Sequence, residues 1–154
     1  MHIYLVQHAE AVSKEDDTSR PLSDKGINDI RRVASFVSEM GITANQIIHS
    51  GKTRAIQTAQ MLGDHLEIEN GIIESEGLVP MDDPSIWLDI ISDTTKDVIL
   101  VGHLPHLSRL VSLITCGDAD KEILDFEMGC MVCLKKSDKG NWLLDWVIKP
   151  GMLK

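Results

Sequence analysis

Three short apolar runs in this chain each end in a polar turn that carries a histidine or an arginine. The runs and the residues that follow them are 3–6 with His8, 46–48 with Arg54, and 98–101 with His103. Runs that are apolar on both faces are typical of parallel strands, and the carboxyl ends of such strands meet at one edge of the sheet. We therefore expect the three side chains to lie close together. Two imidazoles and a guanidinium would form a pocket for a small anion.

The segments between these runs predict helices. Apolar residues recur at helical spacing from residue 27 to 40, behind a good N-cap at Ser23, and Gly41 should end that helix. Further helices are expected over residues 53–66, from the N-cap and proline pair Asp83-Pro84 to about Ile91, and from Pro105 to Gly117. Strand and helix alternate, which predicts right-handed parallel crossovers with helices on both faces of the sheet.

The C-terminal part predicts an antiparallel edge. Two strand-like segments flank Ser137–Gly140, which is a hairpin turn signal, and a short strand is also expected at Ile72 and Ile73. A length of 154 residues with 43% hydrophobic side chains suits one domain over residues 1–154. The predicted fold class is a three-layer α/β sandwich with a mainly parallel sheet and an antiparallel edge hairpin.

Charge and hydropathy narrow the possible partners and the compartment. The formal net charge of -9 would repel a phosphate backbone, and the scattered Lys and Arg residues form no basic face for nucleic acid. No apolar run approaches the roughly 20 residues of a membrane span, and the N-terminal run is too short for a signal peptide. We therefore expect no nucleic-acid or membrane partner and a cytoplasmic location.

The three cysteines, Cys116, Cys130 and Cys133, are too few and too unevenly spaced for a disulfide framework. Cys130 and Cys133 form a CxxC pair, but a strand over residues 129–134 would place them on opposite faces. We expect them to pack in the core and to share no metal.

Two short motifs could suggest other chemistry, but each lacks a residue that this chemistry needs. Gly51-Lys52-Thr53 is similar to the end of a phosphate-binding P-loop, but that pattern needs a glycine where this chain has Gln46. His103 and His106 could suggest a metal pair, but a Leu-Pro turn separates them and no third ligand stands at a recognisable spacing. We predict no metal and no cofactor.

Four motifs, in this order along the chain, resemble those of the histidine phosphatase superfamily, and within it the small SixA-type phosphohistidine phosphatases. They are Gln7-His8-Ala9, Arg20-Pro21-Leu22-Ser23-Asp24-Lys25-Gly26, Ser50-Gly51-Lys52-Thr53-Arg54-Ala55-Ile56-Gln57-Thr58-Ala59, and Gly102-His103-Leu104-Pro105. The similarity covers nearly the whole chain. It implies a phosphoglycerate mutase-like fold and a metal-independent phosphatase.

The resemblance assigns roles to individual residues. His8 would attack phosphorus and carry the phosphate, His103 would donate a hydrogen bond to the phosphoryl oxygens, and Arg20 and Arg54 would bind those oxygens. The general acid has no clear candidate, and Glu76 is the best local one. The implied substrate is a phosphohistidine-containing protein domain, or a small phosphorylated molecule in the alternative.

One position departs from the family pattern, because Gln7 stands where the family has arginine. An amide can still donate a hydrogen bond to a phosphoryl oxygen, but it carries no charge. Gln7 therefore keeps open a weakened phosphohistidine- or phosphate-binding module. Two further alternatives are a phosphatase of small-molecule phosphate esters and an α/β scaffold with no phosphate site. The sequence does not identify the substrate protein, the oligomeric state or the activity that remains with Gln7.

Overall fold

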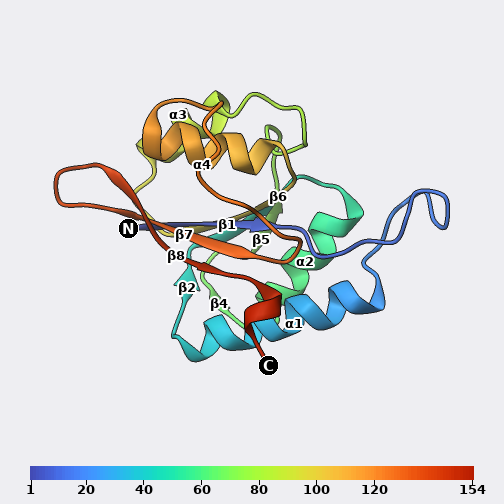
Figure 1. Cartoon of the computed structure of the whole chain (residues 1–154). Helices are drawn as coiled ribbons and strands as arrows, with labels where there is room; N and C mark the ends of the chain where they lie inside the picture. Colours follow the sequence, from blue (N-terminus) through green and yellow to red (C-terminus); the bar gives the residue numbers. More distant parts are fainter.

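A six-stranded, mainly parallel sheet forms the centre of the computed structural model, which describes all residues from 1 to 154 (Figure 1). In spatial order the strands are β5 (Ile72–Glu74), β3 (Gln46–His49), β6 (Val98–Gly102), β1 (His2–Gln7), β7 (Met131–Lys136) and β8 (Trp142–Ile148). The first four are parallel, and β7 and β8 form the predicted antiparallel hairpin at one edge. β6 is buried along its whole length, as expected for a central parallel strand.

Helices cover both faces of the sheet. One face carries α1 (Asp24–Glu39) and α2 (Thr53–Gly63), and the other carries α3 (Ser85–Asp93) and α4 (His106–Cys116) (Figure 1). The remaining elements are the short pair β2 (Thr43–Ala44) and β4 (Glu67–Ile68) and a 3-10 turn at Pro150–Met152. The predicted three-layer α/β class is confirmed. All helices fall short of the length and apolar character that a bilayer crossing requires.

Strand alternation divides the core into two layers. Along β1, Tyr4 and Val6 face α1 and α2, whereas Ile3 and Leu5 face α3 and α4. The same alternation in the C-terminal hairpin separates the two cysteines of the CxxC pair. Cys130 lies in the layer of α3 and α4 and Cys133 in the other, so the two thiols lie on opposite faces of the sheet, as predicted.

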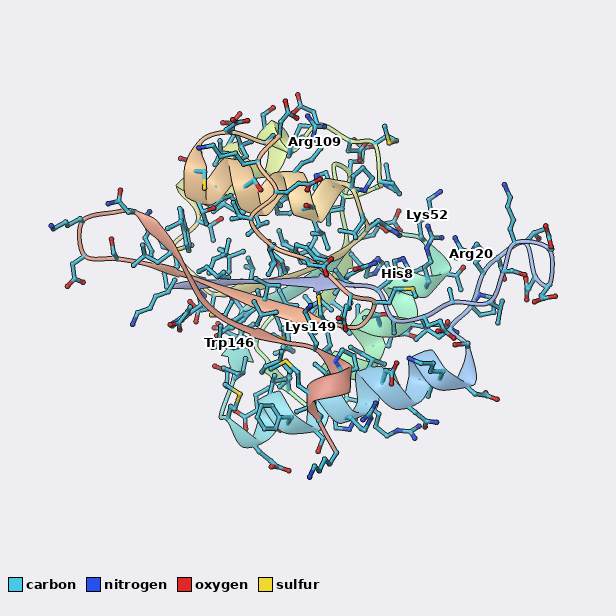
Figure 2. The ribbon with its side chains drawn as sticks, in the orientation of Figure 1. His8, Arg20, Lys52, Arg109, Trp146 and Lys149 are labelled. Carbon is cyan, nitrogen blue, oxygen red and sulfur yellow. The ribbon has the colours of Figure 1, made fainter.

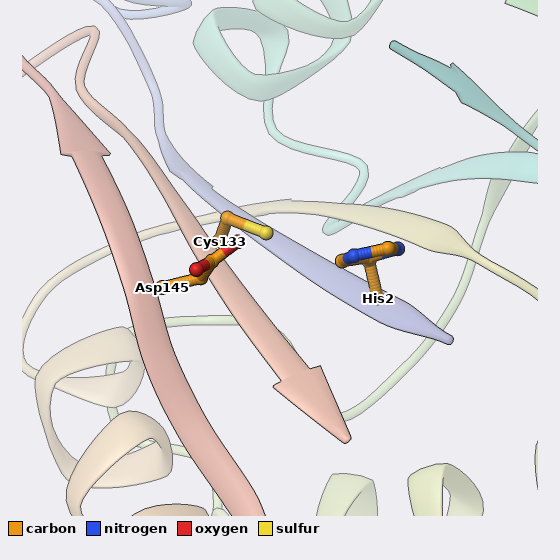
Figure 3. Close-up of side chains that lie close together, drawn as sticks. All are labelled: His2, Cys133 and Asp145. Atoms are coloured by element: carbon orange, nitrogen blue, oxygen red, sulfur yellow. The ribbon is translucent and has the colours of Figure 1, made fainter. Parts of the chain in front are cut away.

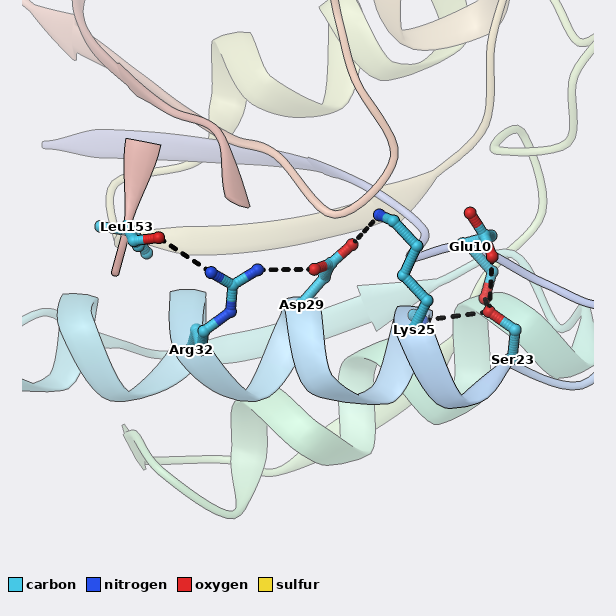
Figure 4. A network of polar contacts seen from close by, with 7 residues as sticks. Glu10, Ser23, Lys25, Asp29, Arg32 and Leu153 are labelled. Carbon is cyan, nitrogen blue, oxygen red and sulfur yellow. Dashed lines mark hydrogen bonds and ion pairs between the residues drawn. The ribbon is translucent and has the colours of Figure 1, made fainter. Parts of the chain in front are cut away.

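The start of α1 is tied to the loop that follows β1. The Ser23 hydroxyl accepts a hydrogen bond from the Gly26 amide at 3.1 Å, as an N-cap should, and donates to the Glu10 carboxylate at 2.9 Å (Figure 4). The Ser23 amide donates to the Glu10 carbonyl at 2.9 Å. Gly26 is needed for this close approach, because a Cβ there would lie 2.0 Å from the Glu10 carbonyl oxygen.

A buried carboxylate connects α1 with the C-terminal segment. Asp29 is 8% exposed at its side chain and pairs with Lys25 at 2.5 Å and with Arg32 at 2.7 Å (Figure 4). These two cations hold the pKa of Asp29 below its usual value against the opposing effect of burial. Arg32 also donates to the Leu153 carbonyl at 2.8 Å, so the network fixes the end of the chain against α1.

Three helix boundaries or faces differ from the sequence prediction. α2 ends at Gly63 instead of near residue 66, although Leu66 remains buried against the core. α3 begins at Ser85, because Pro84 is the residue before the helix and Asp83 accepts a hydrogen bond from the Ser85 amide at 2.9 Å. Met40 was predicted on the inner face of α1 but is 44% exposed, because it caps the last turn, where the helical spacing ends.

Candidate active site

The two predicted histidines lie together at the carboxyl edge of the sheet. His8 directly follows β1 and His103 directly follows β6, and these strands are neighbours. The His8 amide donates to the Gly102 carbonyl at 3.0 Å, which extends the ladder to the point where both side chains leave it. The two ring centroids are 5.1 Å apart. Pairing of the two strands therefore sets the distance between the histidines.

His8 is held in one tautomer. Its Nδ1 lies 2.7 Å from the Ala9 carbonyl oxygen, which can only accept, so Nδ1 carries the proton and donates it. In the neutral ring, Nε2 is then the nitrogen with the free lone pair. Burial lowers the pKa of His8 to about 4, with a further contribution from the positive charges of Arg54 and Arg20, against the raising effect of the Ala9 hydrogen bond. At neutral pH the ring is an uncharged nucleophile.

His103 is almost completely buried and is held by a serine hydroxyl. Its Nε2 lies 2.6 Å from the Ser50 Oγ, and its Nδ1 has no hydrogen-bond partner within the protein. Burial, followed by the proximity of His8 and Arg54, lowers the pKa of His103 to about 3. A buried polar atom without a protein partner is uncommon, so Nδ1 is available to a ligand.

Arg54 stands in the first turn of α2, where backbone N–H groups already favour an anion. Its Nε is buried and has no hydrogen-bond partner within the protein. Burial, and then the charge of Arg20, lowers the pKa of Arg54. Two guanidinium groups close enough to repel one another make a site that a dianion such as phosphate would neutralise.

Arg20 reaches the same region from the long loop after β1. Its backbone has a positive φ of 49°, a conformation that is uncommon for a residue with a side chain. The Arg20 Nε donates to the Val12 carbonyl at 3.1 Å, so this side chain ties the two ends of the loop together. Figure 2 shows Arg20 and Lys52 on the side of the molecule where His8 emerges from the sheet.

The predicted general acid lies at the rim of the site. Glu76 is exposed, and its carbonyl accepts a hydrogen bond from the Trp87 indole at 3.3 Å. It lines a hollow of about 370 Å³ with Ser50, Glu74 and Asp82. Because Ser50 also holds His103, this acidic hollow adjoins the histidine pair. Another hollow, of about 660 Å³, lies at the β2–β4 edge and touches none of the predicted site residues.

A known protein family matches the first half of the chain. The model of the histidine phosphatase superfamily, branch 1, matches residues 3–82. The chain belongs to the histidine phosphatase superfamily. The matched range contains His8, Arg20, Arg54 and Glu76, and ends before His103. This membership supports a phosphatase of the hydrolase class.

Individual relatives of this histidine phosphatase are more distant in sequence than in fold. The phosphohistidine phosphatase SixA of Escherichia coli (strain K12) is 23% identical over 159 aligned positions, covering 100% of this chain and 97% of that protein. A structure of SixA complexed with tungstate matches with a TM-score of 0.89, covering 100% of both chains at 23% identity. A putative alpha-ribazole-5'-P phosphatase from Escherichia coli matches with a TM-score of 0.78 at 14% identity, covering 97% of this chain and 98% of the other.

Gln7 of this histidine phosphatase is 7% exposed, and its Oε1 has no hydrogen-bond partner within the protein. It lies on the wall of a hollow of about 480 Å³ that it shares with Glu10, Lys25, Phe126, Glu127 and Met128. Lys25 is the only cation among these residues, and its amino group is paired with Asp29. No cation on this wall therefore stands in directly for the family arginine. A role for Gln7 in substrate binding stays a prediction.

Sequence reasoning assigned no role to three residues that organise this histidine phosphatase site. The Thr58 hydroxyl accepts from the Ala9 amide at 3.0 Å and donates to the Arg54 carbonyl at 2.8 Å, so it joins the His8 turn to the arginine helix. Gln57 accepts from the Leu22 amide at 2.7 Å, and Ser50 holds His103. Thr58 stands four residues after Arg54, a helical spacing that places both on one face, which was the signal available in the sequence.

Proposed function

We propose that this protein is a metal-independent phosphatase that removes phosphate from phosphohistidine proteins through a covalent phospho-His8 intermediate. The observation that carries the proposal is the hydrogen bond from His8 Nδ1 to the Ala9 carbonyl, which leaves Nε2 as the nucleophilic nitrogen beside His103. A neutral imidazole with a defined tautomer can attack phosphorus without first losing a proton.

In the first step, His8 Nε2 attacks phosphorus, the bond from Nε2 to phosphorus forms, and the bond from phosphorus to the substrate imidazole breaks. The phosphoryl group in transfer carries negative charge on its equatorial oxygens, so catalysis consists mainly of positioning donors around it. Arg54 Nε and His103 Nδ1 supply buried donors without protein partners, and Arg20 supplies a second guanidinium. In the second step, water attacks phospho-His8, releases inorganic phosphate and restores the imidazole.

The leaving group favours phosphohistidine over an alkyl phosphate ester. A phosphorylated imidazole can be protonated on its other ring nitrogen and then leaves as a neutral ring, so it has little need of an enzymatic acid. An alkoxide needs a proton from a positioned acid. Glu76, the proposed acid, is exposed and lies at the rim of the acidic hollow. The similarity to SixA supports the same substrate class.

The test is release of inorganic phosphate from an isolated domain phosphorylated on histidine, measured in EDTA, with an alkyl phosphate ester as the second substrate. We expect hydrolysis of the phosphohistidine in EDTA and slower hydrolysis of the ester. Loss of turnover in EDTA would contradict the metal-free mechanism. Preference for the ester would favour the small-molecule phosphatase.

The same assay separates an enzyme from a binding module. Gln7 is the reason to test this second function, because it brings no charge to a position where the family has arginine. A binding module would bind the phosphorylated domain tightly and release no phosphate. Its release of phosphate would then be no higher than that of the His8→Ala protein. Inorganic phosphate that fails to raise the melting temperature would instead favour a scaffold without a phosphate site, since a ligand of the native state must stabilise it.

A further inference from the structure

Three side chains of metal-binding type converge far from the histidine pair. The ligand atoms of His2, Cys133 and Asp145 all lie within 4.8 Å of one another. They come from three adjacent strands, β1, β7 and β8, and Figure 3 shows them grouped over the same part of the sheet. His2 starts the strand that ends before His8, so at about 3.3 Å per residue this cluster lies about 20 Å from the phosphate site.

A carboxylate directly before the neighbouring strand β6 orients His2. Asp97 accepts the His2 backbone amide at 2.7 Å with one oxygen, and its other oxygen lies 3.1 Å from the His2 Nδ1. With Nδ1 donating its proton to Asp97, Nε2 carries the lone pair of the ring. At protein zinc sites, the histidine that binds the metal usually donates its other ring N–H to an acceptor such as a carboxylate. The carboxylate fixes the tautomer of the histidine and raises its basicity.

We propose that His2 Nε2, Cys133 Sγ and an Asp145 carboxylate oxygen bind one zinc-type divalent cation, with water as the fourth ligand. An imidazole, a thiolate and a carboxylate suit Zn²⁺ and its analogues, whereas Mg²⁺ and Ca²⁺ prefer oxygen ligands alone. Binding transfers the Cys133 thiol proton to solvent as the bond from sulfur to metal forms. Tetrahedral coordination at the bond lengths of Zn²⁺ needs the ligand atoms roughly 3.5 Å apart, so the three side chains must move toward one another by up to about 1 Å when the cation binds.

The carboxylates beside Cys133 favour a cation, whereas burial by itself favours the neutral thiol. Burial, followed by the nearby carboxylates of Asp145 and Asp97, raises the pKa of the Cys133 thiol to about 12. The thiol is therefore neutral, and the carboxylates make the local potential negative. A divalent cation would reverse that potential and favour the thiolate.

The experiment is titration of the reduced, untagged, EDTA-treated and dialysed protein with Co²⁺, followed by absorption, with Zn²⁺ as the competitor. We expect one equivalent of Co²⁺ to produce a thiolate-to-cobalt charge-transfer band that Zn²⁺ abolishes. Cys133→Ala should remove the band, and the matched control Cys130→Ala should keep it, because Cys130 is on the opposite face of the sheet. Asp97→Asn should weaken Co²⁺ binding by about 10- to 100-fold while keeping the band.

A second variant keeps the test decisive if Cys133→Ala does not fold. Asp145 is exposed, so Asp145→Asn should fold normally and bind Co²⁺ more weakly than the wild-type protein. The proposal is overturned if wild-type protein gives no charge-transfer band, if the band survives in Cys133→Ala, or if Asp145→Asn binds as tightly as wild type. Phosphatase turnover in EDTA is a separate readout: its loss would count against the proposed function, and a missing cobalt band counts only against this site.

Discussion

The rings of His8 and His103 stand with their centroids 5.1 Å apart, and each ring is anchored by an oxygen of its own. The Ala9 carbonyl anchors His8, and the Ser50 hydroxyl anchors His103. Both rings are buried beside Arg54, which keeps them uncharged at neutral pH. In such a pair the positive charge of the site comes from the arginines alone, and the neutral His8 ring provides the nucleophilic lone pair.

His8→Ala should abolish turnover, because His8 is proposed to form and break the bond to phosphorus. Rapid quenching of wild-type protein with labelled substrate should leave a phosphate that is labile in acid and stable in alkali, and peptide mapping should place it on His8. The melting temperature of the variant serves as the folding control. Label on His103, on a serine or on an aspartate would contradict the assignment.

Arg54→Ala should lower turnover by about 10³-fold or more and also weaken phosphate binding, since its guanidinium is proposed to hold the anion in both the ground and the transition state. Lys52→Ala is the matched control, because Lys52 is exposed and lies two residues away at the start of the same helix. We expect it to change kcat/KM little. If Lys52→Ala is the more damaging change, the proposed role of Arg54 is wrong.

Gln7→Arg should raise kcat/KM by about 10-fold or more. An arginine donor to a transferring phosphoryl group is worth about 10³–10⁵ in rate, and one uncharged donor about 10²–10³, so an arginine at Gln7 should regain part of the difference. The expected gain is set at the lower end because the hollow beside Gln7 is lined by none of His8, Arg54 and His103. Gln7→Lys, measured alongside, separates the two-pronged arginine contact from simple charge. No gain in a folded arginine variant would mean that another cation compensates or that the site does not catalyse.

The free energy of unfolding should decrease as the pH is lowered through the range in which the histidines of the unfolded chain take up protons. The pKa of His8 is about 4 in the folded protein and about 6.5 when unfolded, so below about pH 6.5 the unfolded chain binds more protons. The contribution of His8 is complete above its unfolded pKa and is lost as the pH falls toward 4. Between about pH 6.5 and 5 the loss should be about 1–2 kcal/mol. Urea unfolding of wild type and His8→Ala at both pH values measures it, and an equal loss in both proteins would refute the shift.

Gly26→Ala should destabilise the protein by about 1–3 kcal/mol, because the added Cβ would lie 2.0 Å from the Glu10 carbonyl oxygen and backbone must move to admit it. Gly151→Ala is the control, since a Cβ there has nothing within 4 Å. Thermal unfolding of both variants measures the difference. Equal melting temperatures would mean that the loop after β1 moves away from α1 without cost.

The sequence by itself determined the elements that deliver the site, because the signals involved are local. Apolar runs on both faces identified β1, β3 and β6, and the spacing of apolar residues behind Ser23 identified α1. Since parallel strands end at one edge, the order of elements also predicted that His8, Arg54 and His103 lie together. The CxxC pair was correctly split between two faces by strand alternation alone.

Only the tertiary structure decided the contacts that depend on two segments distant in the chain. Ser50 reaches His103, Thr58 joins the His8 turn to α2, and Asp97 holds His2 beside Cys133, each through a side chain whose partner no local pattern specifies. The depressed pKa values of the histidines have the same origin. Burial is their main cause, and burial of a side chain is set by the packing of the whole sheet with its helices.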